Sequence, residues 1–200
     1  MGIGFKVFFI GFNKCATRSF TSLFREAGLN PYHGGDADPL YDQIPRNIAA
    51  GRKPLEGFED YDAYSDSQRL SFRFRDIDRG YPNSKFVLNT RDVNRWIVSR
   101  LNHGDGTYVE YMNEAKNKNL TWDEWVSVWR LQFIEHERQV TTYFQGRSES
   151  FLRYDIETDS LANFNKFIGV ELAPDGVELP HHGLTMQKFF ALDGDRIIKL

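Results

Sequence analysis

The sequence predicts an α/β fold: a three-layer domain in which helices flank both faces of a central, mainly parallel sheet. Short, nearly continuous apolar runs, such as residues 5–10 and 85–88, are typical of strands that are buried on both faces, as the strands of parallel sheets are. Segments with apolar residues at helical spacing lie between these runs. Such alternation of strands and helices is the pattern of α/β proteins.

Each predicted element has its own signal in the sequence. The apolar runs predict strands at residues 5–10, 62–64, 85–88 and 150–154. Amphipathic spacing predicts helices at residues 20–27, 70–77, 96–101, 122–144 and 161–168. Thr121 and Glu124 have the spacing of a capping box at the start of the longest helix, whose tryptophans we expect in the core, and Gly169 ends the last helix.

The composition favours one folded domain over residues 1–200. Of its residues, 40% are hydrophobic, which is enough for a core, and a net charge of −3 argues against a nucleic-acid binder. Cys15 is the single cysteine, which excludes an intramolecular disulfide. No apolar run reaches the roughly 20 residues of a membrane span, and the first residues lack the plan of a signal peptide. We therefore expect a cytoplasmic protein without a membrane span; its oligomeric state is not indicated.

The segment from Gly11 to Ser19 lies between the first strand and the first helix, where a phosphate-binding loop belongs. The N–H groups of the first helical turn and the helix dipole favour an anion there, and Lys14, Thr17, Arg18 and Ser19 add side-chain donors. The segment is not a Walker A loop, because Lys14 is followed by Cys15 rather than by the hydroxyl that holds Mg²⁺. The alternative is an ordinary turn in which Thr17 only caps the helix.

A second candidate pair is Arg91 and Ser99. Arg91 follows the strand at 85–88, and Ser99 comes eight residues later, about two turns into the next helix, so both can face one crevice. A guanidinium fork and a hydroxyl together suit a phosphate monoester. The alternative is a surface ion pair and a solvated helix face, and Asp92 between them is well placed as a helix cap.

Taken together, these segments resemble the sulfotransferase superfamily that uses 3′-phosphoadenosine 5′-phosphosulfate (PAPS). Lys14-Cys15-Ala16-Thr17-Arg18 is similar to the family's loop for the 5′-phosphosulfate, with Ala16 where the family usually has Gly, and Arg91 with Ser99 matches its motif for the 3′-phosphate. The resemblance implies a P-loop NTPase-like sulfotransferase fold, PAPS as donor and PAP as product. It also implies that the cofactor is bound by Asn13, Lys14, Cys15, Ala16, Thr17, Arg18, Ser19, Arg91 and Ser99, with Lys14 stabilising the leaving group.

The family commonly places a basic or acidic catalytic side chain after the strand that precedes the Arg-bearing strand, and Asp66 occupies that place. Its alternative role is the N-cap of the helix at 70–77. His33 and His103, each beside glycine in a predicted loop, are rival bases. His181 and His182 are adjacent with no third ligand nearby in the sequence, so we assign no metal.

The resemblance thus implies transfer of a sulfuryl group to a hydroxyl or amine of a small-molecule or carbohydrate acceptor, with no nucleic-acid partner. Two alternatives remain open. A P-loop-type nucleotide or small-molecule kinase would also use the loop and the arginine, and a non-catalytic domain would bind PAP or another nucleotide without turnover.

Overall fold

The computed structural model of the chain describes residues 2–35, 38–104, 107–174, 176–180 and 189–200. These residues fall into two compact units. The first comprises Met1–Thr90 and Val140–His182, and the second comprises Arg91–Gln139 and Gly183–Leu200.

The first unit is built on a five-stranded sheet in the order β2-β3-β1-β4-β5. All neighbouring strands in it run parallel, so their carboxyl ends lie at one edge. The strands are β1 (Val7–Phe9), β2 (Pro31–His33), β3 (Ala63–Ser65), β4 (Lys85–Thr90) and β5 (Phe151–Asp155). The predicted parallel sheet is therefore confirmed, while the short strand β2 was not predicted.

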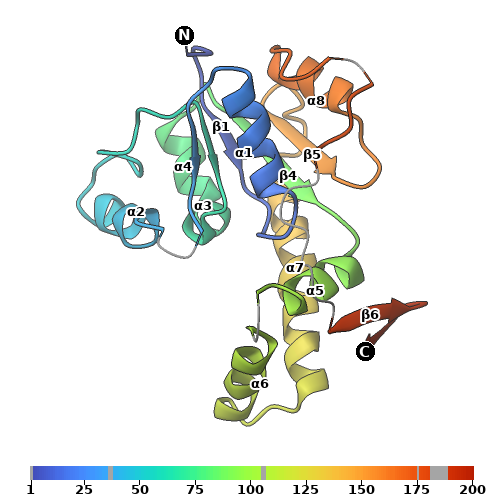
Figure 1. Ribbon diagram of the computed structural model, residues 1–200. Helices are drawn as coiled ribbons and strands as arrows, with labels where there is room; N and C mark the ends of the chain where they lie inside the picture. The colour runs from blue at the N-terminus through green and yellow to red at the C-terminus, as the bar shows by residue number, and fades with distance from the viewer. Residues whose placement is uncertain (1, 36–37, 105–106, 175, 181–188) are drawn as a thin grey trace. The chain divides into compact units, whose positions relative to one another are not determined.

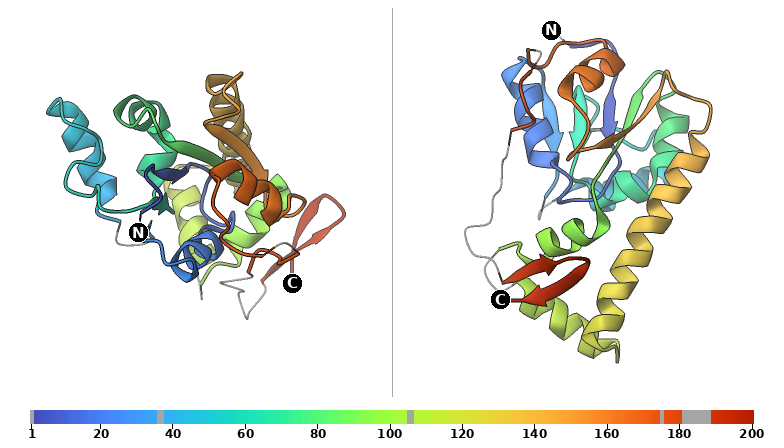
Figure 2. Two further views of the ribbon diagram at one scale, coloured as in Figure 1. Left: turned by 90° about the horizontal axis from the view of Figure 1, so that it is seen from above. Right: turned by 90° about the vertical axis from the view of Figure 1, so that its right-hand side faces the viewer.

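Helices cover both faces of this sheet (Figures 1 and 2). Because side chains alternate along a strand, Val7 and Phe9 of β1 join one apolar cluster with α1 and α8, while Phe8 joins another with α3, α4 and the end of α7. The helices of this unit are α1 (Thr17–Glu26), α2 (Leu40–Ala49), α3 (Gln68–Phe72), α4 (Phe74–Gly80) and α8 (Leu161–Ile168). This is the expected three-layer arrangement.

The second unit contains helices α5 and α6, most of α7, and a hairpin. Its elements are α5 (Val93–Leu101), α6 (Thr107–Asn117), α7 (Trp122–Tyr143), β6 (Phe190–Asp193) and β7 (Arg196–Lys199). Aromatic rings pack within it, and Trp129 is 3% exposed, as expected for a core residue. Asn102 attaches the hairpin, because its side chain accepts from the N–H of Phe189 at 2.8 Å and donates to the carbonyl of Phe190 at 2.9 Å.

Local signals placed several helix ends correctly. Glu124 and Thr121 bond reciprocally at the start of α7, Asp92 accepts from the N–H of Arg95 at 2.9 Å, and Gly169 ends α8 in the left-handed region. The single helix predicted at 70–77 is instead two, because the chain leaves helical geometry at Arg73. Helices α2 and α6 and the hairpin β6–β7 were not predicted.

Candidate active site

The loop between β1 and α1 has an unusual backbone. Lys14 has φ 65° and Ala16 has φ 60°, both in the left-handed region that L side chains rarely adopt. Ala16 is the N-cap of α1, and its methyl side chain cannot accept a bond from the first N–H groups of the helix. The alternative in which Thr17 merely caps α1 is therefore wrong: Thr17 is the first helical residue, and its carbonyl accepts a bond from Thr21 Oγ1 at 2.8 Å.

The side chains of this loop differ in exposure. Asn13 and Arg18 are exposed and Lys14 is half-buried, whereas Cys15 is fully buried and Thr17 and Ser19 are 5% and 3% exposed. Because Cys15 is fully buried, its thiol does not face solvent. The exposed donors and the start of a helix whose N-cap has no side-chain acceptor make the loop suited to a phosphate or sulfate group.

Two side chains from neighbouring elements hold the loop. Asn89 of β4 accepts from the N–H of Gly11 at 3.0 Å and donates to the carbonyl of Cys15 at 2.8 Å, and Ser71 Oγ donates to the carbonyl of Gly11 at 2.8 Å. A Cβ on Gly11 would lie 1.9 Å from the carbonyl oxygen of Asn89, so only glycine fits there. Sequence reasoning missed Asn89 and Ser71, since no local spacing signals contacts 60 and 78 residues apart.

Two of the predicted bases form a pair. His33 ends β2, Asp66 directly follows β3, and His33 Nε2 lies 3.5 Å from Asp66 Oδ2. Parallel pairing of His33 with Ser65 brings the two segments together, and Gly34 permits it, because a Cβ there would lie 2.5 Å from the carbonyl oxygen of Asp66. The two side chains are 21% and 16% exposed, so the pair is largely shielded from solvent.

Asp66 does not cap the following helix. Ser67 is the N-cap of α3, and Asp66 has φ 56°, in the left-handed region. The predicted capping alternative for Asp66 is therefore wrong. A non-glycine residue held at positive φ beside a histidine is the kind of strain that clusters at functional sites.

Burial is the main cause that lowers the pKa of His33 below its usual range. The carboxylate of Asp66 opposes this shift, while the charges of Arg18 and Arg25 reinforce it. A lowered pKa keeps the imidazole neutral at pH 7, and a neutral imidazole can accept a proton. The pair is thus suited to general-base chemistry.

The other predicted residues belong to the second unit. Arg91 follows β4 directly along the chain and is half-buried, Ser99 lies half-buried on α5, and His103 lies in the turn after α5. Asp92 is the N-cap of α5, as the sequence predicted.

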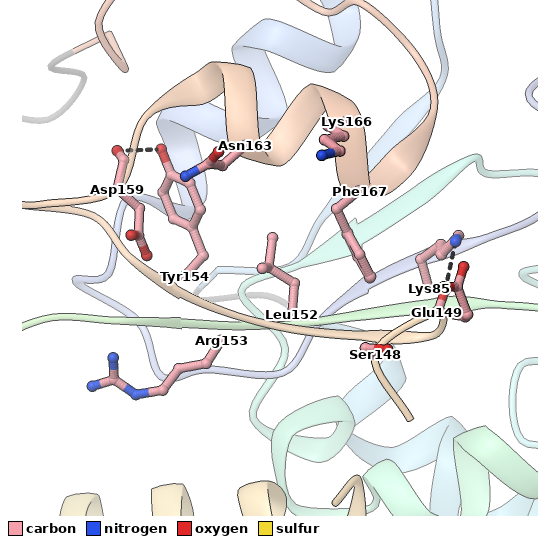
Figure 3. Close-up of a pocket in the computed structure, with 10 residues that line it drawn as sticks. All are labelled: Lys85, Ser148, Glu149, Leu152, Arg153, Tyr154, Asp159, Asn163, Lys166 and Phe167. Carbon is pink, nitrogen blue, oxygen red and sulfur yellow. Dashed lines mark hydrogen bonds between the residues drawn. The ribbon is translucent and has the colours of Figure 1, made fainter. Parts of the chain in front are cut away.

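A separate groove of about 410 Å³ adjoins β5 and α8 in the first unit (Figure 3). Lys85 there donates to the carbonyl of Glu149 at 2.5 Å, and its ammonium lies 5.0 Å from the centre of the Phe167 ring. None of the predicted site residues lines this groove.

The described residues contain no group of three or more His, Cys, Asp or Glu side chains that could hold a metal ion. His181 and His182 lie outside the described residues. Within the same residues, no helix combines the length and hydropathy that crossing a bilayer requires.

Comparison with known proteins points to one family. The family model described as the sulfotransferase domain matches residues 6–132, which include the loop at 11–19, Asp66, Arg91 and Ser99. The crystal structure of a sulfotransferase from Alicyclobacillus acidocaldarius is similar in fold, with a TM-score of 0.54 and 13% identity over 92% of this chain and 86% of that chain. Comparison with curated proteins finds no match. With the family model matching more than half of its length and the parallel sheet of the fold in place, this chain belongs to the sulfotransferase family.

Proposed function

We propose that this protein is a PAPS-dependent sulfotransferase that transfers a sulfuryl group to a hydroxyl or amine of a small-molecule or carbohydrate acceptor. The observation that carries the proposal is the His33–Asp66 pair, 3.5 Å apart at the same carboxyl edge of the sheet from which the loop bearing Lys14 extends. Transfer of a sulfuryl group from an anionic donor to a protonated acceptor requires a base and an anion-binding loop close together, and one sheet edge provides both.

The loop fits the phosphosulfate end of the donor. The N-cap Ala16 offers no side-chain acceptor to the start of α1, and the first N–H groups and the positive end of the helix dipole favour a dianionic group. Lys14, Thr17, Arg18 and Ser19 would supply side-chain donors, and Asn13, Cys15 and Ala16 would contribute backbone N–H groups. Arg91 and Ser99 are proposed to hold the 3′-phosphate, as the family resemblance implies.

When bound, PAPS supplies the group to be transferred: the acceptor atom bonds to sulfur while the bond from sulfur to the bridging oxygen breaks, and PAP leaves with the electron pair. Lys14 would place a positive charge near that bridging oxygen, where negative charge develops. The site must also take up the proton that the acceptor loses.

His33 and Asp66 are proposed to take this proton together. The neutral imidazole has one donor and one acceptor nitrogen, and a proton on Nε2, which faces Asp66, leaves Nδ1 to accept the proton of the acceptor. The carboxylate of Asp66 then stabilises the imidazolium. Asp66 as the direct base and His103 as a rival base are the alternatives, and the turnover of Asp66→Asn, His33→Ala and His103→Ala distinguishes the three.

Calorimetry with PAP and with ATP, each with and without Mg²⁺, tests the choice of donor. We expect PAP to bind without Mg²⁺ and ATP to bind weakly or not at all. Mg²⁺-dependent binding of ATP in preference to PAP would instead indicate a P-loop kinase. PAP binding with no release of PAP from PAPS in the presence of any phenol, amine or sugar acceptor would indicate a non-catalytic nucleotide-binding domain.

A further inference from the structure

The side chain of Asn89 joins the two ends of the loop that carries Lys14. Its Oδ1 accepts from the N–H of Gly11 at 3.0 Å, and its Nδ2 donates to the carbonyl of Cys15 at 2.8 Å. Asn89 is 1% exposed and lies on β4, a central strand of the sheet. The loop is therefore fastened at both ends to one rigid side chain.

This fastening acts where the backbone is strained. Cys15 lies between Lys14 at φ 65° and Ala16 at φ 60°, two non-glycine residues in the left-handed region. Such conformations are strained and persist only where the surroundings impose them. The bond from Asn89 to the carbonyl of Cys15 is such a constraint, and the bond from Ser71 to the carbonyl of Gly11 holds the opposite end of the loop.

We propose that Asn89 is a positioning residue of the sulfuryl-transfer site. By bridging Gly11 and Cys15 it holds the backbone N–H groups of the loop and the side chain of Lys14 in the geometry that binds the 5′-phosphate of the donor. A preformed loop loses less conformational entropy when the ligand binds, so the bridge raises affinity. This inference rests on the proposed function.

The substitution Asn89→Asp isolates one half of the bridge. The ionised carboxylate still accepts from Gly11 but repels the carbonyl of Cys15, whereas the protonated carboxyl has the same shape as the amide and donates to that carbonyl again. Burial raises the pKa of a carboxyl group, so acid restores the lost bond in an accessible pH range. At pH 8 we expect Asn89→Asp to bind PAP with a dissociation constant roughly tenfold above that of the parent. At pH 5 we expect the two dissociation constants, measured at that same pH, to agree within about threefold.

Asn47→Asp is the matched control. Asn47 is also fully buried, and its Nδ2 donates to the carbonyls of Pro54 and Glu56, each at 3.0 Å, far along the chain from the loop. Its substitution removes comparable bonds, so it costs comparable stability. It leaves PAP affinity at the parental value at both pH values. If both variants weaken PAP binding equally, the effect is a general loss of stability and the inference is wrong.

Asn89→Ser provides a second, neutral variant that cannot span both partners. In the ligand-free protein we expect the amide of Gly11 to exchange its hydrogen at least about tenfold faster than in the parent, because its acceptor is gone. Parental exchange, or parental PAP affinity of Asn89→Asp at pH 8, would overturn the inference. Failure of the parent itself to bind PAP would overturn the proposed function instead, and the exchange measurement on the ligand-free protein still decides the role of Asn89.

Discussion

Lys14 is the residue on which the proposed chemistry depends most. It is half-buried in the loop after β1, and Ala tolerates its positive φ no worse than Lys does. We expect Lys14→Ala to lower kcat by roughly 10²- to 10³-fold, because losing one group that stabilises developing negative charge costs about 2.7 to 4 kcal/mol of barrier. The thermal midpoint should stay at the parental value. The substitution Lys116→Ala, at an exposed lysine of α6, serves as the control. If Lys14→Ala keeps more than about a tenth of the parental kcat, Lys14 does not stabilise the leaving group.

At Asp66, the substitution Asp66→Asn removes the charge and keeps the shape. Asn adopts positive φ as readily as Asp does, so the backbone at φ 56° is preserved. We expect turnover to fall by roughly 10²- to 10⁴-fold with PAP binding intact. His33→Ala should lose a comparable factor if the imidazole holds the proton. A parental rate in His33→Ala would leave Asp66 as the direct base.

The pH profile gives the same pair a second test. His33 accepts a proton only when neutral, and burial lowers its pKa, so kcat/KM of the parent should fall as the pH drops through a value below about 6.5. Because the carboxylate of Asp66 raises that pKa, the acid limb of Asp66→Asn should shift to lower pH. An acid limb that does not move would mean that Asp66 does not act on His33.

Arg91 is proposed to read only the 3′-phosphate. Arg91→Ala should therefore weaken binding of PAP by about 1.5 to 3 kcal/mol and leave binding of AMP, which differs from PAP only by that phosphate, nearly unchanged. Ser99→Ala should do the same to a smaller degree. Calorimetry with the two nucleotides measures both effects. Equal losses of affinity for PAP and AMP would mean that Arg91 maintains the structure of the site and does not contact the 3′-phosphate.

Among the elements, α1 begins under strain. Its N-cap residue, Ala16, has φ 60°, a conformation that costs an L residue about 1 to 2 kcal/mol and that glycine adopts without strain. Glycine also makes the unfolded chain more flexible, which offsets part of the stability gained by relieving the strain. We expect Ala16→Gly to raise the free energy of unfolding by about 0.5 to 1 kcal/mol in denaturant titrations. Ala27→Gly, at the other end of α1 where φ is −75°, should lower it instead. Destabilisation by Ala16→Gly would contradict the strain.

At the scale of the whole molecule, Asp78 ties α4 to the end of α7. It accepts two bonds from Arg147, at 2.7 and 2.8 Å, and one from Tyr143 at 2.7 Å. Burial by itself raises the pKa of this carboxyl, but the bonds from Arg147 and Tyr143 hold it below its usual range. A carboxyl with a lowered pKa stabilises the fold above its unfolded pKa of about 3.9, and this contribution is lost as the pH falls through the folded value.

Asp78→Asn should therefore lower the free energy of unfolding by about 1.5 to 3 kcal/mol at pH 7. The difference from the parent should shrink once the pH falls below about 3.9, and it should close below the lowered pKa of the folded carboxyl, where the parental carboxyl is protonated as well. Glu135→Gln removes an exposed ion pair of α7 and should change the thermal midpoint far less. A pH-independent difference for Asp78→Asn would mean that shape, not charge, matters at this position.

By itself, the sequence determined the elements with strong local signals. The strands predicted at 85–88 and 150–154, the capping box of Thr121 and Glu124, and Gly169 at the end of α8 all depend on neighbouring residues, so spacing revealed them. The strand-loop-helix that carries Lys14 was placed for the same reason, whereas β2, with only three residues, offered too short a pattern.

Only the tertiary structure decided which distant residues meet. His33 and Asp66 come together through the parallel pairing of β2 with β3, and Asn89 reaches Gly11 because β4 lies beside β1. Strand order is set by the packing of the whole sheet, and no spacing along the chain encodes it. The left-handed backbone of Asp66 likewise overrode the local capping signal, since contacts made far along the chain can hold a residue in a conformation that its neighbours alone do not favour.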